Sequence, residues 1–282
     1  MPDISPDVRG VITAVLCKDG KTSDRFFDHP RLGEVYRAYV IAGVLDLESN
    51  PGSSAEDLPA GRAARVLSSF RLTGEGSENW TQLYEHTGGV VAAAVTIARR
   101  MRLPVRDAEH IRSAALLHDA TKRVDIERFQ VLANSLEHTN HRLRQTMQEA
   151  GFSAVTISAA MNTGREDRKF NSAVSRWRSI RSKGVVPAVV GLADARTIGA
   201  EFRSLESALE YYLGRKKDAE SQEFFARHWV PYYRAVEDYL KEQCSGLDLR
   251  ISSKDIYNET IFPEVFGSRP SRAIRERYRY SE

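Results

Sequence analysis

The stretch from Trp80 to Met101 constrains the fold most strongly, because its apolar side chains recur with the period of an α-helix. Pro104 follows just beyond it and cannot continue a helix. One histidine shares the apolar face, which carries Leu83, His86, Val90, Ala94, Ile97 and Met101. The pattern therefore predicts an amphipathic helix with a histidine turned toward the protein core.

Helical patterns also fill most of the remaining chain. Pro187 argues against a central strand in the apolar run from Val185 to Ile198 and suits the first turn of a helix. Gly151 is expected just past the end of another helix. The predicted helices are Leu32 to Leu47, Ala60 to Phe70, Trp80 to Met101, Asp107 to Ala120, Thr139 to Ala150, Ala154 to Asn162, Val185 to Ile198, Glu206 to Leu213 and Glu220 to Glu242. We expect an all-α fold.

The chain divides into three parts on this reading. Residues 1–78 form an N-terminal helical extension, residues 79–200 a helical core, and residues 201–282 C-terminal helices with a basic tail packed on that core. The end of the chain, from Ser252 to Glu282, is interpreted as a polar tail that either binds a partner subunit or is mobile.

Composition limits the classes of function. No apolar run approaches the roughly 18–20 residues needed to cross a bilayer, and the first residues lack the pattern of a signal peptide, so we expect a cytoplasmic protein that does not contact a membrane. The net charge of +3 is small for 282 residues, so nucleic acid is a possible but not a favoured partner. The cysteines are only Cys17 and Cys244, so any metal must be held by histidines and carboxylates.

The polar residues expected inside the core are His86, the pair His118-Asp119 and Asp194. His118-Asp119 ends the run of small and apolar residues that begins at Ser113, and Asp194 shares a helical stripe with Val186 and Val190. A lone histidine on an apolar face is more often a core residue than a ligand, but a carboxylate on a buried face needs a partner. Nitrogen and carboxylate oxygen together suit a divalent ion of Mn, Fe, Co, Ni, Zn or Mg.

The order His86, His118-Asp119, Asp194 resembles the HD superfamily of metal-dependent phosphohydrolases. The resemblance covers about residues 80–200, and its middle pair lies within Ala115-Leu116-Leu117-His118-Asp119-Ala120-Thr121-Lys122. It implies an HD-domain helical core with additional helices at both ends, and it implies that His86, His118, Asp119 and Asp194 are metal ligands. It also implies hydrolysis of a phosphate ester or anhydride, with Asp119 and Lys122 in catalytic roles.

A narrower resemblance is to the branch that cleaves dinucleoside tetraphosphates, in which two further histidines bind a second metal. His138, expected just before the helix Thr139 to Ala150, matches the first of them. The second position reads Asn162-Thr163-Gly164, so an asparagine replaces the histidine. An amide is a weak ligand for a transition metal, and the comparison therefore favours one metal over two.

Basic residues near the predicted site are candidates for binding substrate phosphates. The segment 165–183 is strongly basic, with Phe170 and Trp177 interleaved, and forms either a solvated surface or an anion-binding loop. The candidate phosphate-binding residues are Lys122, Arg123, Arg165, Arg168 and Lys169.

Three functions follow as hypotheses. The first is a phosphohydrolase that uses metal-activated water on a small-molecule phosphate, above all a nucleotide, as a monomer or an oligomer. The second is a non-catalytic HD module that binds a nucleotide or nucleic acid. The third is an HD-type di-iron oxygenase, which needs the complete histidine set that Asn162 interrupts.

Overall fold

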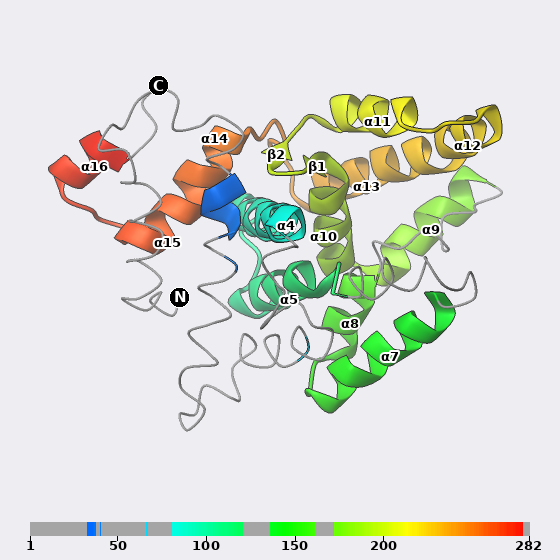
Figure 1. Ribbon diagram of the computed structural model, residues 1–282, viewed down its shortest axis with the longest axis horizontal. Coiled ribbons are helices and arrows are strands. Elements are labelled where there is room, and N and C mark those ends of the chain that lie inside the picture. Colours follow the sequence, from blue (N-terminus) through cyan, green and yellow to red (C-terminus); the bar gives the residue numbers. More distant parts are fainter. Residues whose placement is uncertain are drawn as a thin grey trace.

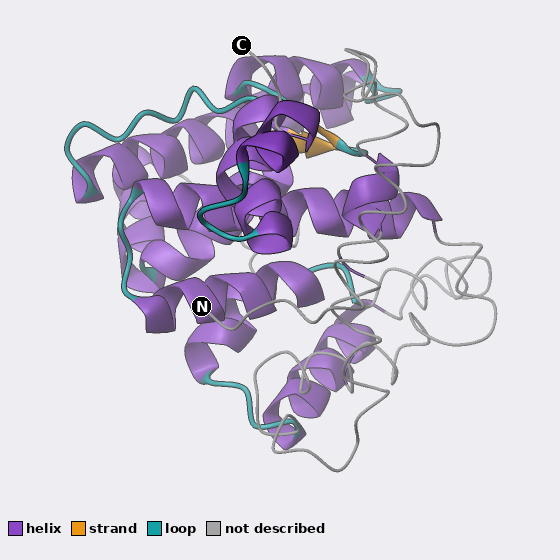
Figure 2. Cartoon of the chain, turned by 90° about the vertical axis from the view of Figure 1, so that its left-hand side faces the viewer, coloured by secondary structure: helices purple, strands orange, loops and turns teal. Residues whose placement is uncertain are grey.

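The described part of the chain is built from helices, as the sequence predicts. The computed structural model describes residues 33–37, 40, 66, 81–120, 136–161 and 172–278 (Figure 1). Within these ranges the strands form a single two-stranded antiparallel sheet that pairs Thr197 with Phe202 (Figure 2). The elements are α4 (Thr81–Arg100), α5 (Val105–Leu117), α7 (Leu136–Glu149), α8 (Ala154–Met161), α9 (Ala173–Lys183), α10 (Val185–Arg196), β1 (Thr197–Ile198), β2 (Glu201–Phe202), α11 (Leu205–Gly214), α12 (Ala219–Phe224), the π-helix η5 (Phe225–Trp229), α13 (Val230–Gln243), α14 (Ser253–Ile256), the π-helix η6 (Tyr257–Ile261), α15 (Phe262–Phe266) and α16 (Arg272–Tyr278).

Helix α4 lies in the middle of the fold, where Figure 1 shows it nearly end-on. It packs against α5, α10 and the C-terminal η6. The predicted apolar face is confirmed, but burial extends around the whole helix, because every residue from Val90 to Ala98 is buried. A helix that is apolar on all sides is a core helix. Helix α10 has the same character and contacts α4, α5, α8 and α13.

Helices α7 and α4 each end at a residue with a positive φ. Gly151 has a φ of 76°, and its N–H and that of Phe152 bond back to Gln148 and Met147, which confirms it as the residue after α7. Helix α4 ends in the same motif, but Arg102 takes the left-handed position with a φ of 54°. Pro104 then precedes α5.

Several predicted helix boundaries are wrong; α5, for example, runs from Val105 to Leu117 rather than from Asp107 to Ala120. Helix α7 begins at Leu136 rather than Thr139, because Leu136 and Glu137 favour a helix and nothing interrupts it. His138 therefore lies in the first turn of α7 and not before it. Helix α10 ends at Arg196 rather than Ile198, because Thr197 and Ile198 form β1. The chain then turns at Gly199, which has a φ of 61°. The expected single helix from Glu220 to Glu242 is interrupted by η5.

The interpretation of Ser252 to Glu282 as a polar tail is also wrong for most of its length. Residues 253–266 are continuously helical, and α14 and η6 pack on α4. The Oγ1 atoms of Thr260 and Thr96 lie 2.7 Å apart in the core. The buried residues of this segment are Ile256, Tyr257, Thr260, Ile261, Phe262 and Val265. The C-terminal segment is therefore part of the core.

Arg196 joins the end of α10 to two later segments. It is almost fully buried, and its guanidinium donates hydrogen bonds to the carbonyl oxygens of Arg203 at 2.7 Å, Leu249 at 2.7 Å and Ile251 at 3.4 Å. Its flat face lies over the ring of Phe202, 4.3 Å from the centroid. Burial lowers the pKa of Arg196 to about 10, against the opposing effect of Glu237 and Glu206, so the side chain stays charged near neutrality.

Candidate metal centre

Three helices bring four polar side chains together inside the fold. His86 comes from the second turn of α4, His118 and Asp119 follow the last turn of α5, and Asp194 lies near the end of α10. Ala114 and Ala115 are fully buried on α5, and such small side chains allow neighbouring helices to approach closely. The structure therefore places together the four residues whose order in the sequence resembles the HD ligand set.

The four groups face one another across short distances. His86 Nε2 lies 3.2 Å from Asp194 Oδ1 and 3.7 Å from Asp119 Oδ2. His118 Nε2 lies 3.4 Å from His86 Nε2. It is also 3.4 Å from Asp194 Oδ1 and 3.6 Å from Asp119 Oδ2. Two imidazole nitrogens and two carboxylates at such distances require protons or a cation among them.

These distances fit a bound divalent metal ion. Ligand atoms about 2.1 Å from a tetrahedral ion lie about 3.4 Å from each other. The five distances span 3.2 to 3.7 Å. The ligand atoms of His86, His118 and Asp119 all lie within 4.8 Å of one another, and Asp194 adds a second carboxylate against both histidines. The donor set and its spacing are those of a site that could hold a metal.

A backbone carbonyl orients His118. Its Nδ1 donates a hydrogen bond to the carbonyl oxygen of Ala115 at 2.6 Å, since a carbonyl can only accept. Nδ1 therefore carries a proton, and Nε2 is the nitrogen that faces His86 and the carboxylates. This second hydrogen bond is the usual way in which a protein fixes the tautomer of a metal-ligating histidine.

His118 and Asp194 shift each other's pKa. Burial would lower the pKa of His118, but the carboxylates of Asp119 and Asp194 outweigh it and raise that pKa to about 9. Burial would raise the pKa of Asp194, but its hydrogen bonds to His118 and His86 hold that pKa well below its usual range. Without a metal, the site therefore keeps a proton on His118 at neutral pH.

The site is fully buried at His118 and partly exposed at its other three side chains. The His118 side chain is fully buried, whereas the side chains of His86, Asp119 and Asp194 are 14%, 17% and 21% exposed. A small molecule would therefore approach from the side of His86 and the two carboxylates.

Tyr212 on α11 is a neighbour of the site that the sequence gives no reason to select. Its hydroxyl lies 3.5 Å from the carbonyl oxygen of Thr197, just past the end of α10. Burial, followed by the negative charges of Asp194 and Asp119, raises its pKa. The hydroxyl therefore stays protonated. No sequence motif marks it, because its position depends on how α11 folds back after the β1–β2 turn.

The other predicted site residues lie at the edge of the described structure or beyond it. Helix α7 includes His138, but its side chain lies outside the description. Asn162 and the candidate phosphate-binding residues lie outside the described ranges; the latter are Lys122, Arg123, Arg165, Arg168 and Lys169. Their roles stay predictions.

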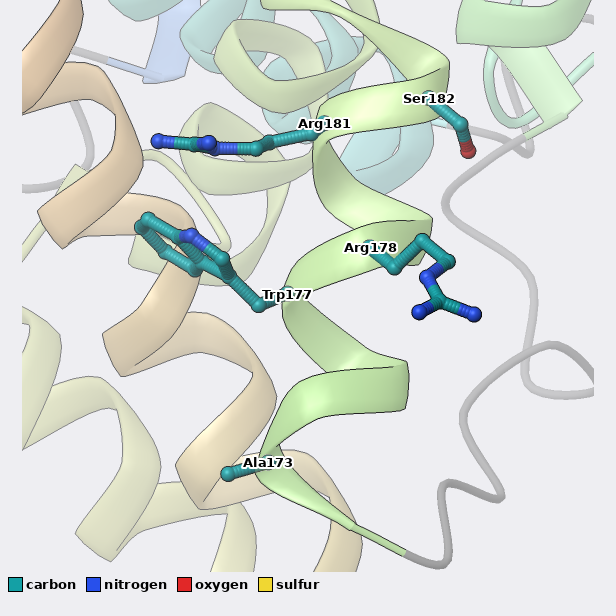
Figure 3. A pocket seen from close by; sticks show the side chains of 5 residues that line it. All are labelled: Ala173, Trp177, Arg178, Arg181 and Ser182. Atoms are coloured by element: carbon teal, nitrogen blue, oxygen red, sulfur yellow. The ribbon is translucent and has the colours of Figure 1, made fainter.

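The basic segment 165–183 is described from Ser172 onward, where it forms α9. A shallow pocket is lined by Ala173, Trp177, Arg178, Arg181 and Ser182 (Figure 3). Trp177 and Arg181 lie on one side of the helix, where Arg181 pairs with Glu242 on α13 at 3.2 Å, and Arg178 and Ser182 lie on the other. Arg178 and Arg181 thus project from different sides of α9.

Comparison with known proteins finds no matching family model, no matching curated protein and no matching solved structure. Among the residues that the structure describes, no helix combines the length and the apolar character that a membrane crossing requires.

Proposed function

We propose that this protein is a metal-dependent phosphohydrolase that acts on a phosphate ester or anhydride of a nucleotide. The observation that carries the proposal is the convergence of His86 and His118 with Asp119 and Asp194, with nitrogen and oxygen atoms 3.2 to 3.7 Å apart. The order of these residues, which resembles the HD superfamily, connects the geometry to phosphate chemistry.

The site has the properties that such a reaction needs. A divalent ion bound there would supply Lewis acidity, which lowers the pKa of a bound water and neutralises charge on a phosphoryl oxygen. His118, held by the carbonyl of Ala115, presents a fixed nitrogen. The partly exposed carboxylate of Asp119 can orient the attacking water. Lys122, three residues later, is proposed to bind a substrate phosphate.

The test is turnover by protein purified without chelator and loaded separately with Mn²⁺, Fe²⁺, Co²⁺, Ni²⁺, Zn²⁺ or Mg²⁺. The substrate panel comprises nucleoside mono-, di- and triphosphates, dinucleoside polyphosphates and phosphodiesters, with products separated by chromatography. We expect at least one metal to support turnover and His118→Ala and Asp194→Asn to reduce it about 100-fold or more, because each removes a ligand. Metal analysis of the same samples gives the number of ions bound.

Control substitutions at exposed positions distinguish the loss of a ligand from a general loss of folding. His141 and Asp238 are exposed residues on α7 and α13, so His141→Ala and Asp238→Asn should keep full activity. The proposal is wrong if no loaded form turns over any substrate and His118→Ala changes neither metal content nor nucleotide binding. Tight nucleotide binding without turnover would instead favour the binding-module hypothesis.

A further inference from the structure

Helix α4 touches Thr197, the C-cap residue of α10, at a point about one turn from the ligands that the two helices carry. A Cβ atom at Gly89 would lie 2.9 Å from Cγ2 of Thr197, closer than real Cβ atoms come to other carbons. Gly89 lies three residues after His86, and Thr197 lies three residues after Asp194. Gly89 is a neighbour of His86 on α4, and Thr197 bonds back to Ala193 and Asp194, so this contact adjoins the pair in which His86 Nε2 and Asp194 Oδ1 are 3.2 Å apart.

The methyl group of Thr197 is not free to move away. The side-chain hydroxyl donates to the carbonyl oxygen of Ala193 at 2.7 Å, and the backbone N–H bonds to Ala193 and Asp194. Rotating the side chain to relieve a contact would break the hydroxyl bond inside the core, where Thr197 is 1% exposed.

The ring of Tyr36 also packs against this position. Two ring carbons of Tyr36 would lie 3.4 Å from a Cβ atom at this position. Tyr36 is itself 1% exposed, and a Cβ atom at the adjacent Gly88 would overlap its backbone carbonyl oxygen. A side chain at Gly89 therefore has no space to enter unless α4 and α10 move apart by a few tenths of an ångström.

We propose that Gly89 and Thr197 are positioning residues that set the spacing of α4 and α10 and thereby the separation of His86 from Asp194 in the metal site. The inference rests on the proposed metal-binding function. A metal site tolerates errors of only about 0.2 Å in its ligand distances, so a shift of a few tenths of an ångström at this contact changes affinity. Glycine is unfavourable inside a helix relative to alanine, and the close approach accounts for its presence at position 89.

The experiment titrates metal-free protein with Co²⁺ and records affinity and the visible absorption spectrum, which reports the arrangement of ligands around cobalt. The variants are Gly89→Ala, Thr197→Ser and the two combined. We expect Gly89→Ala to weaken Co²⁺ binding about tenfold or more and to alter the spectrum. Thr197→Ser removes the obstructing methyl and keeps the hydroxyl, so alone it should match the parent protein, and in combination it should restore both affinity and spectrum.

Gly214→Ala is the matched control, because nothing lies within 4 Å of a Cβ atom at that position, and it should bind Co²⁺ like the parent. Parent-like affinity and spectrum in Gly89→Ala, or no recovery in the double variant, would overturn the inference while leaving the proposed function intact. Failure of the parent protein to bind Co²⁺ or any other metal would overturn both. If Gly89→Ala does not fold, a soluble, cobalt-binding double variant supports the inference and an insoluble one contradicts it.

Discussion

The Nδ1 proton of His118 is donated to the carbonyl oxygen of Ala115 at 2.6 Å, one turn earlier in the chain. The other nitrogen of the same ring is the one that faces Asp119 and Asp194, and their charges keep a proton on the imidazole when no metal is present. A metal ion and a proton therefore compete for one nitrogen, and metal binding becomes dependent on pH.

Metal binding should release a proton near neutrality. With a His118 pKa of about 9 in the metal-free protein, we expect release of about one proton per ion at pH 7 and an affinity that rises about tenfold per pH unit up to pH 9. Calorimetric titration in buffers of different ionisation enthalpy counts the protons. Equal heats in all buffers, after correction for the metal's own buffer binding, would contradict the competition.

The stability of the metal-free protein should fall as the pH rises. The pKa of His118 is about 9 in the folded protein, against about 6.5 for a histidine in an unfolded chain, so the folded state binds the proton more tightly. The stabilisation is fully present below pH 6.5 and is lost as the pH rises through 9. The thermal unfolding midpoint should therefore drop between pH 6.5 and 9.5. His118→Gln lacks the titrating group, and an equal drop in that variant would refute the assignment.

Arg196 should be among the most sensitive positions outside the metal site. Arg196→Met leaves the carbonyl oxygens of Arg203 and Leu249 without their donor in a buried setting, so we expect a loss of about 2–4 kcal/mol in the free energy of unfolding. Urea unfolding followed by circular dichroism measures it. Arg250→Met is the control, because the Arg250 side chain is 93% exposed, and its unfolding midpoint should not move.

Removing either hydroxyl of the pair Thr96 and Thr260, between α4 and η6, should change the stability by a different amount. Thr96 donates to the carbonyl oxygen of Ala92 at 2.8 Å, so Thr260 must donate to Thr96. Thr96→Val removes the acceptor of that proton and should cost about 1–2 kcal/mol, more than Thr260→Val, which removes only the donor. The double variant should cost less than the sum, as measured in a double-mutant cycle. Additive losses would mean that the two hydroxyls do not interact.

The convergence of the candidate ligands could be predicted because each lies in or directly after a segment with simple helical spacing. His86 shares a helix face with Val90 and Ile97, and Asp194 shares one with Val190. The period of the α-helix was therefore enough to predict that both side chains point toward the core. The end of α7 could be predicted in the same way, because the glycine at position 151 favours the positive φ found just after a helix. The start of α7 was missed by three residues although Leu136 and Glu137 favour a helix.

The C-terminal segment could not be read in the same way. Its buried residues Ile256, Tyr257, Thr260, Ile261, Phe262 and Val265 are interspersed with polar residues, and several basic residues follow Gly267. These polar and basic residues made the whole segment resemble a polar tail. The contact between Gly89 and Thr197 was likewise invisible in the sequence, since it depends on the packing of two helices.

The ligand set has a consequence for the order in which the protein is made. His86 and Asp194 are separated by 108 residues, and the remaining two ligands fall between them. A nascent chain cannot present the complete set until α10 has left the ribosome, so the candidate site can assemble only after the central helices have been synthesised.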